Sequence, residues 1–228
     1  MLLCQSLSLR FDDVLGLEIL DQTKLPQKEE WIHVTSPQVM LEAIQSLRVR
    51  GAPLIGIAAS LFWAYWIHKC DCHEADRVYQ ELRRARPTAI NLMNNLDYCY
   101  HVFSKNHSPT EVLRVAVDLF FNDVEQCEQM ANWGASLMEN GDFVLTYCNT
   151  GSLATAGIGT ALGVIKRSWS LGKRIHVYVC ETRPLGQGAR LTLWELRKVG
   201  IPCTLICDNM VGLLMQKSKI NKVIVGAD

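Results

Sequence analysis

The hydrophobic pattern of this chain changes its period near Asn140, and no other feature constrains the fold more. Between Ser36 and Asn140, apolar residues recur at intervals of three and four, which is typical of helices with one buried face. Beyond Asn140, short β-branched or aromatic runs alternate with helix-length segments, and this alternation predicts a parallel sheet. The expected strands cover residues 143–147, 175–179, 203–206 and 222–225.

The change of period also predicts an α/β protein with two domains. We expect a mostly helical N-terminal domain over residues 1–140, with a small sheet whose strands lie near 17–20 and 31–34. Residues 141–228 are expected to form a Rossmann-like domain built on the parallel sheet. The boundary is placed at Asn140-Gly141-Asp142, because turn-forming residues interrupt the pattern there.

Serine followed by proline marks two helix starts in the N-terminal half. Ser36-Pro37 and Ser108-Pro109 each combine an N-cap residue with a proline, which the first helical turn tolerates. The longest apolar run, residues 55–66, has about half of the roughly 20 residues that a membrane helix needs. This run therefore predicts a buried helix, and we expect no contact with a membrane.

Composition argues against nucleic-acid binding and against a secreted, disulfide-bonded protein. The 23 basic and 23 acidic residues balance, so the chain has no net positive charge that would attract nucleic acid. The N-terminus lacks the basic start of a secretory signal, and the 9 cysteines are too scattered for a disulfide framework. We expect a cytoplasmic protein. Cys70 to His73 resemble half of a zinc site, but no second Cys/His pair follows at finger spacing, so we predict no metal.

The residues that follow the predicted strands are the strongest indication of a functional site. Parallel strands bring their carboxyl ends to one edge of the sheet, where ligands bind. The residues at this edge include a thiol, carboxylates, an amide and a guanidinium, which is more chemistry than a structural edge requires. They are residues 148–151, 180–183, 207–210 and 226–228.

Cys148 is the candidate base or nucleophile at this edge. It ends a predicted strand, and we expect the turn after it to open a long helix over residues 153–169. Backbone N–H groups at a helix start stabilise a thiolate. A buried structural cysteine is the alternative interpretation.

Gly157-Ile158-Gly159 resembles part of a dinucleotide-binding fingerprint. In that fingerprint the glycines form the turn between strand and helix, whereas we expect these glycines inside the helix. We therefore predict that the glycines let the helix lie close to the sheet, and that the protein uses no nucleotide cofactor.

Two arginines precede predicted helices. Arg50 lies before Gly51 and Ala52, and Arg86 lies in a break between helices. An arginine beside the N–H groups of a helix start can hold a phosphate, although each is also compatible with a solvated arginine at a capped helix end. At the sheet edge, Asp208 has the alternative role of an N-cap.

Together these motifs resemble the methylthioribose-1-phosphate isomerase family, whose fold is shared by regulatory subunits of the translation-initiation guanine-exchange factor. The enzymes of the family carry the cysteine and aspartate found here as Cys148 and Asp228, and the regulatory relatives generally do not. The matching stretches follow in order over nearly the whole chain, at residues 20–26, 49–58, 86–92, 148–164, 181–196, 208–210 and 225–228.

The resemblance implies conversion of 5-methylthioribose 1-phosphate to 5-methylthioribulose 1-phosphate in methionine salvage, without metal or nucleotide, by a homodimer. Asp228 would be the general acid or base that assists ring opening, and Cys148 would handle the hydrogen on C2 as a thiolate. The residues that the resemblance assigns to the small-molecule sugar phosphate are Arg50, Gly51, Ala52, Arg86 and Gln187, with Asp208 and Asn209 along the same edge.

The chain also departs from the family. Tyr147 stands where the family usually has histidine, and the family continues well past the aspartate found here as Asp228. We therefore expect a truncated chain with an uncovered sheet edge and weak or absent activity. Two alternatives stay open: an isomerase of ribose 1,5-bisphosphate that uses the same Cys/Asp pair, and a non-catalytic regulatory relative that binds a sugar phosphate or nucleotide.

Overall fold

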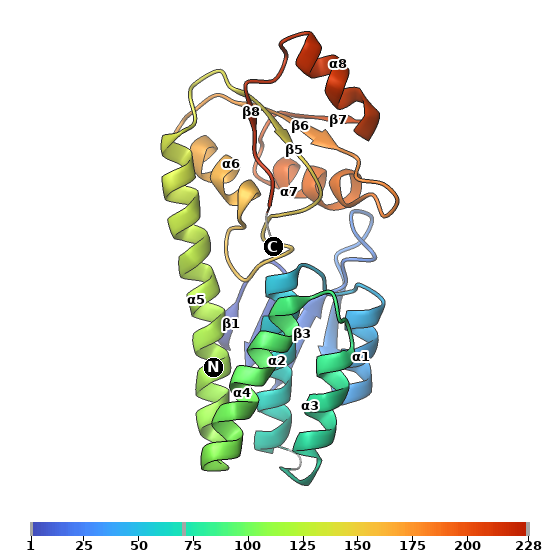
Figure 1. The fold of residues 1–228 in the computed structure, drawn as a ribbon, viewed down its shortest axis with the longest axis vertical. Coiled ribbons are helices and arrows are strands. Elements are labelled where there is room, and N and C mark those ends of the chain that lie inside the picture. The colour runs from blue at the N-terminus through green and yellow to red at the C-terminus, as the bar shows by residue number, and fades with distance from the viewer. Residues whose placement is uncertain (1, 70–71, 227–228) are drawn as a thin grey trace. The chain divides into compact units, whose positions relative to one another are not determined.

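The computed structural model describes residues 2–69 and 72–226, and the chain divides into two compact units (Figure 1). The first unit comprises Met1–Lys24 and Lys28–Val124, and the second comprises Leu25–Gln27 and Glu125–Asp228. The long helix α5 (Pro109–Ser136) contributes residues to both units.

The first unit opens with a four-stranded antiparallel sheet in the order β1-β2-β3-β4. Its inner face is apolar: Leu9 pairs with Ile19 and Phe11 with Leu17, and all four side chains are fully buried. The strands predicted near 17–20 and 31–34 are confirmed, and two earlier strands precede them. The bounds are β1 (Leu2–Gln5), β2 (Leu9–Asp12), β3 (Gly16–Leu20) and β4 (Trp31–Val34).

Helices fill the rest of the first unit, and α2 is their centre. This helix contacts β3, α1, α3 and α4, and it is buried on nearly all sides because its residues are apolar or small (Figure 1). None of the helices in the described ranges is long and apolar enough to cross a bilayer. The bounds are α1 (Pro37–Gln45), α2 (Ala52–Lys69), α3 (Ala75–Arg84) and α4 (Ile90–Asn106).

The predicted helix starts are confirmed by their capping hydrogen bonds. The N–H of Val39 donates to Ser36 Oγ at the start of α1, and the N–H of Glu111 donates to Ser108 Oγ at the start of α5. Proline follows each serine, where no intrahelical N–H donor is needed.

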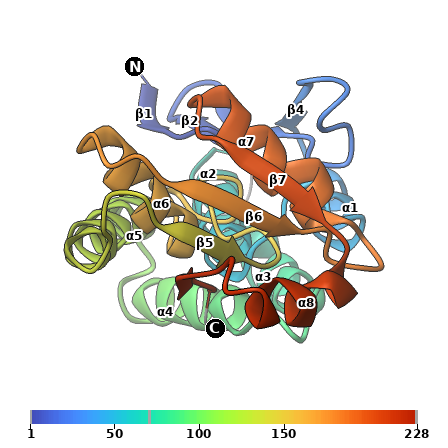
Figure 2. The same ribbon diagram turned by 90° about the horizontal axis from the view of Figure 1, so that it is seen from above.

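The second unit contains the predicted parallel sheet, with strand order β7-β6-β5-β8 (Figure 2). Helices α6 and α7 cover one face through a core that includes Val177, Leu162 and Leu196. Helix α8 packs on the other face beside Ile206. The α/β fold class is therefore confirmed. The bounds are β5 (Phe143–Thr146), α6 (Ala161–Ser170), β6 (His176–Cys180), α7 (Leu193–Lys198), β7 (Cys203–Ile206), α8 (Val211–Gln216) and β8 (Lys222–Val223).

The connection after β5 differs from the prediction. A helix was expected from residue 153, but residues 147–160 form a loop and α6 begins at Ala161. The loop folds back on itself through a bridge between Gly151 and Gly159. Gly159 has a φ of 106°, and a Cβ there would lie 2.5 Å from Gly151 Cα, so only glycine fits. The expectation that Gly157 and Gly159 lie inside a helix is therefore wrong.

Candidate active site

The carboxyl ends of β5, β6 and β7 are tied together by hydrogen bonds. The Cys148 N–H donates to Thr182 Oγ1 at 2.9 Å. The Thr182 N–H donates to Asp208 Oδ1 at 2.9 Å, and the Arg183 N–H donates to Asp208 Oδ2 at 2.8 Å. Three of the four segments expected at this edge are thus adjacent.

Two residues at this edge have an unusual backbone conformation. Cys148 has a φ of 61° and Thr182 a φ of 62°, both in the left-handed region. A β-branched residue is rare there, and such conformations persist only where surrounding contacts impose them. Thr182 is buried, and its hydroxyl also donates to the Cys180 carbonyl at 3.2 Å. Its side chain therefore joins the end of β6 to the backbone of Cys148.

Glu195 on α7 organises the loop that follows Cys148. Its side chain is fully buried and forms an ion pair with Lys166 on α6 at 2.6 Å. The carboxylate also accepts hydrogen bonds from the backbone N–H groups of Ser152 (2.9 Å) and Leu153 (3.2 Å) and from Asn149 Nδ2 (2.8 Å). A Cβ on Gly151 would lie 2.3 Å from Glu195 Oε2, so the loop lies directly against the carboxylate.

The loop bound by Glu195 bears on two predictions, one about nucleotide binding and one about the surroundings of Cys148. Consecutive backbone N–H groups between a strand and a helix are the usual cradle for a nucleotide phosphate, but here those of Ser152 and Leu153 bind an internal carboxylate. The expectation that Cys148 lies beside the start of a helix is also wrong, because α6 begins only at Ala161. Cys148 instead has a fixed backbone and a partly exposed side chain.

Two cysteines of this edge differ in environment. Burial raises the pKa of the Cys180 thiol, and the nearby charge of Asp208 adds to the effect. Cys180 is therefore a neutral, buried thiol with a structural role. Cys148, which follows the neighbouring strand, is more exposed.

Gln187 lies where α7 is preceded by a π-helical turn over Gly188–Thr192. A Cβ on Gly188 would lie 1.7 Å from the Cys180 carbonyl oxygen, so glycine lets this turn press against the end of β6. Within the described part of the chain, Gln187 Oε1 is buried and has no hydrogen-bond partner. This oxygen can accept a hydrogen bond from a ligand hydroxyl, and π-helical turns often occur at functional sites.

Asp208 has a structural role that differs from the expected N-cap. Its carboxylate binds the backbone of the loop after β6, and the short turn Asp208–Met210 has Cys207 as its N-cap residue. The N-cap alternative is therefore wrong. Asn209 follows on the same turn with an exposed side chain.

The predicted phosphate-binding residues belong to the first unit. Arg50 is half-buried and precedes Gly51, whose φ of 89° permits the tight turn into α2 at Ala52. Arg86 lies between α3 and α4.

The N-terminal ends of α2 and α4 touch, since a Cβ on Gly56 would lie 2.6 Å from the Asn91 carbonyl oxygen. Both arginines are therefore near one end of the helix cluster, whereas Asp228 lies outside the described residues.

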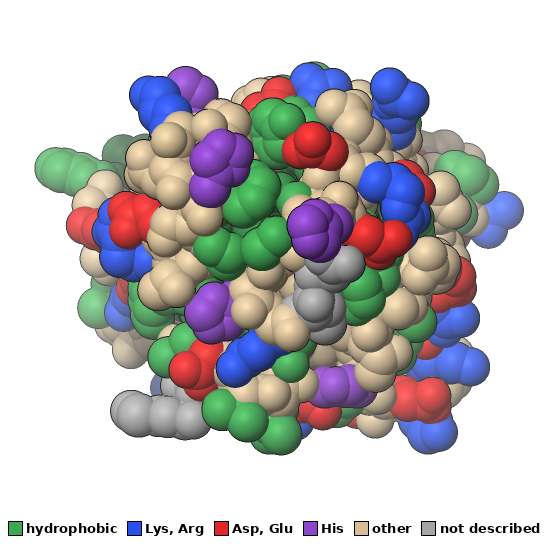
Figure 3. All heavy atoms as spheres, turned by 90° about the horizontal axis from the view of Figure 1, so that it is seen from below, with side chains coloured by type: hydrophobic (Ala, Val, Ile, Leu, Met, Phe, Trp, Pro, Cys, Tyr) green, Lys and Arg blue, Asp and Glu red, His purple; other side chains and the backbone are tan. Residues whose placement is uncertain are grey.

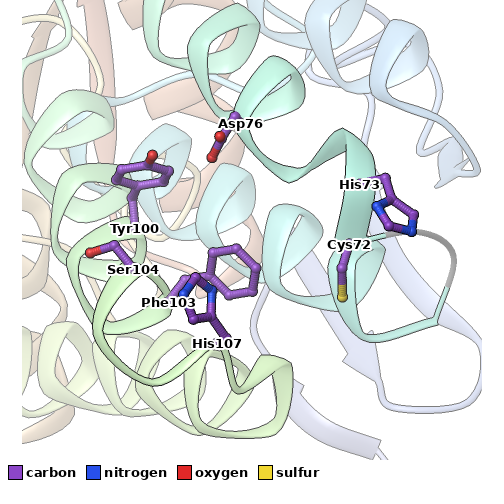
Figure 4. Close-up of a pocket in the computed structure, with 7 residues that line it drawn as sticks. All are labelled: Cys72, His73, Asp76, Tyr100, Phe103, Ser104 and His107. Atoms are coloured by element: carbon purple, nitrogen blue, oxygen red, sulfur yellow. The ribbon is translucent and has the colours of Figure 1, made fainter.

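The first unit also has a cavity of about 350 Å³ near the other end of its helices. Figure 3 shows histidines among hydrophobic side chains on this face, and Figure 4 shows Asp76 and Tyr100 near one another, apart from Cys72 and His73. In the described ranges, no three His, Cys, Asp or Glu side chains are placed to hold a metal ion. The cavity lining among the described residues contains no arginine or lysine, so it suits a phosphate ester poorly. It consists of Cys72, His73, Asp76, Tyr100, Phe103, Ser104 and His107.

Sequence reasoning placed Thr182 at the sheet edge but did not predict its role, and it missed Glu195 and Lys166. Glu195 had a detectable signal, because it is an acid four residues after the apolar Leu191, a spacing that places both side chains on one buried helix face. A buried acid is rarely placed without a specific partner. Thr182 gave no comparable signal, since its role depends on a contact with a residue of another strand.

The family of the chain follows from its fold and from its matches to known proteins. Residues 48–228 match the model of the initiation factor 2 subunit family, so the chain belongs to this family. Among its relatives, a methylthioribose-1-phosphate isomerase from Yersinia enterocolitica is 46% identical over 213 residues, which are 93% of this chain and 62% of that protein. The resemblance to the isomerase family is confirmed.

Two crystal structures have the same fold. One is described as translation initiation factor eIF-2B, subunit delta, from A. fulgidus, with 44% identity, a TM-score of 0.80, and coverage of 97% of this chain and 68% of that chain. The other is 5-methylthioribose 1-phosphate isomerase from Pyrococcus horikoshii OT3, with 29% identity, a TM-score of 0.90, and coverage of 99% and 67%. The chain thus spans between 62% and 68% of the length of these relatives.

Proposed function

We propose that the protein containing this chain is an isomerase that converts 5-methylthioribose 1-phosphate to 5-methylthioribulose 1-phosphate. The observation that carries the proposal is Cys148, a partly exposed thiol whose backbone is held in a left-handed conformation by the loop after the neighbouring strand. The 46% identity to the Yersinia enterocolitica protein of that name supports the choice of substrate.

The chemistry divides into ring opening and hydrogen transfer. In the first step, a general acid, assigned to Asp228, gives a proton to the ring oxygen while the bond between that oxygen and C1 breaks. In the second, the Cys148 thiolate takes the proton from C2, and the electron pair left behind forms a double bond between C1 and C2. A proton then returns to C1 while the hydroxyl on C2 loses its proton, so the product is the ketose with its phosphate still on C1.

The remaining groups would bind the substrate. Arg50 and Arg86 would hold the phosphate, assisted by the backbone of Gly51 and Ala52, because an arginine fork matches phosphate oxygens. Gln187 Oε1, buried without a partner in the described ranges, would accept a hydrogen bond from a sugar hydroxyl. The turn at Ser152 and Leu153 would not hold the phosphate, since its N–H groups already bind the Glu195 carboxylate.

Replacement of Cys148 by serine tests this proposal in the complete gene product. Cys148→Ser keeps the size of the side chain but removes the thiolate, so turnover should fall by at least about 100-fold, as expected for loss of a general base. Cys72→Ser, which changes an exposed thiol of the first unit, is the matched control and should retain full turnover. Unchanged turnover in Cys148→Ser would remove the catalytic assignment.

A second function is favoured by one observation. The A. fulgidus structure described as a subunit of a translation initiation factor is 44% identical to this chain, so a non-catalytic role in a regulatory assembly is the alternative. The same assay separates the two functions, because a regulatory subunit would not turn over the sugar phosphate. Ribose 1,5-bisphosphate should be assayed beside the methylthio substrate, and preference for the bisphosphate would identify the sibling isomerase.

A further inference from the structure

We propose that Glu195, together with Lys166, is a positioning residue that fixes the backbone conformation of Cys148. This inference rests on the proposed function for its catalytic consequence. The Glu195 side chain is fully buried, and its carboxylate binds Asn149, Ser152 and Leu153 of the loop after β5 and Lys166 on α6.

The ion pair between Glu195 and Lys166 joins α7 to α6 and also binds the loop after β5. Lys166 Nζ also donates to Ser152 Oγ at 3.0 Å and to the Ile158 carbonyl at 3.4 Å, so it joins two separate positions of the loop. Only 11% of the Lys166 side chain is exposed. Two charges removed from water in this way lose hydration, and a well-packed apolar pair is often at least as stable. Stability alone therefore does not account for the pair, whereas the definition of one loop conformation does.

A short path leads from Glu195 to the backbone of Cys148. Asn149 Nδ2 donates to Glu195 Oε1 at 2.8 Å, which fixes the side chain of the residue after Cys148. Thr192 Oγ1 donates to the Cys148 carbonyl at 2.6 Å and lies 3.3 Å from Asn149 Nδ2. The peptide group after Cys148 is thus anchored by the π-helical turn and α7.

The other side of Cys148 is anchored independently. Its N–H donates to Thr182 Oγ1, which belongs to the loop after β6. Both peptide groups around Cys148 are therefore fixed while φ is held at 61°. The hydrogen bonds of Glu195 and Lys166 described above go to the loop around Cys148, so we assign these two residues an effect on the reaction through the direction in which the thiol points.

Three variants test the inference in the complete gene product. Glu195→Gln keeps the size of the side chain, but an amide offers one acceptor oxygen instead of two and cannot balance the charge of Lys166. The double variant Glu195→Gln/Lys166→Met removes both charges and restores a neutral interior. Thr192→Val removes only the hydroxyl that holds the Cys148 carbonyl, which keeps the test available if Glu195→Gln fails to fold.

The expected results separate positioning from stability. For Glu195→Gln, kcat should fall about 10- to 100-fold while KM changes less than about threefold. The double variant should regain the wild-type melting temperature but keep the low kcat, and Thr192→Val should lower kcat in the same direction. Glu128→Gln is the matched control, because it removes the ion pair between Arg167 of α6 and Glu128 and leaves Glu195 and Lys166 in place, so its kcat should be unchanged.

A readout without substrate separates this inference from the proposed function. The rate at which iodoacetamide alkylates Cys148, resolved by mass spectrometry, should change at least fivefold in the double variant, while the rate at Cys207 stays constant. If the wild-type protein does not isomerise the sugar phosphate, the proposed function fails and the alkylation rate still decides the inference. Wild-type kcat in the double variant, or an unchanged alkylation rate at Cys148, would overturn it.

Discussion

Helix α2 and the loop after β5 are both buried, but they are held in place by opposite kinds of interaction. In α2, side chains such as Leu54, Leu61 and Trp63 are fully buried among other apolar groups. In the loop, Asn149 and Ser152 are buried because their polar groups bind Glu195 or Lys166. Apolar packing tolerates substitutions that keep volume, whereas a polar network requires each partner.

This difference indicates where function is placed. A residue of α2 can be replaced by another of similar volume with little effect on the fold, so the helix provides stability rather than specificity. The loop holds one cysteine in a conformation that an isolated chain avoids. Such strain is characteristic of functional sites, and the predictions below set the two regions against each other.

The largest effect on stability is expected in α2. Trp63 is fully buried, and its Nε1–H donates to the Ala75 carbonyl at 3.0 Å. Trp63→Ala would leave a large cavity and an unpaired carbonyl, so the free energy of unfolding should fall by about 3–5 kcal/mol. Urea denaturation measures this change.

The comparison also predicts what Trp63→Ala leaves unchanged. At a temperature where the variant is folded, the alkylation rate of Cys148 should equal that of the wild-type protein. A loss of less than about 1 kcal/mol would contradict the assignment of α2 as the stabilising core.

A smaller loss of stability with a larger loss of turnover is expected at Thr182. Thr182→Val keeps the β-branched shape and leaves the Cys148 N–H without its acceptor, which should cost about 1–3 kcal/mol. Turnover should fall about tenfold or more, because one of the two anchors of Cys148 is lost. Denaturation and steady-state kinetics on the same preparation measure both effects.

Thr204→Val is the control for Thr182→Val. Thr204 lies on β7 with an exposed side chain and contacts His176, so its replacement should change stability by less than about 0.5 kcal/mol. If Thr182→Val behaved like Thr204→Val in both measurements, the hydrogen bond across the strand ends would have no functional role.

The sequence pattern was sufficient for the strands and for the buried helix. The β-branched runs predicted all four parallel strands, and the apolar run at 55–66 predicted α2, because both signals depend on residues close together in the chain. The helix predicted over residues 153–169 is confirmed only from Ala161 onward, and its first part is wrong because that segment depends on a contact distant in sequence. Its small apolar residues suit a buried helix, but the backbone there is held by Glu195, more than forty residues away in sequence.

For the candidate site, the sequence predicted which residues lie at one edge of the sheet but not which side chains hold them there. Strand order alone brought Cys148 and Asp208 to one edge, as the hydrogen bonds through Thr182 show. The role of Thr182 and the partners of Glu195 could not be predicted, because they arise from side-chain contacts between segments that are distant in sequence. The assignment of catalytic roles to Cys148 and Asp228 stays a prediction.

Protection of Cys148 by substrate shows whether the sugar phosphate binds beside this thiol. The alkylation rate of each cysteine by iodoacetamide is measured by mass spectrometry with and without saturating 5-methylthioribose 1-phosphate. We expect substrate to slow alkylation of Cys148 at least about tenfold and to leave the exposed Cys72 unaffected. An equal rate at Cys148 with and without substrate, under conditions where binding is shown independently, would contradict the placement of the sugar phosphate at this thiol.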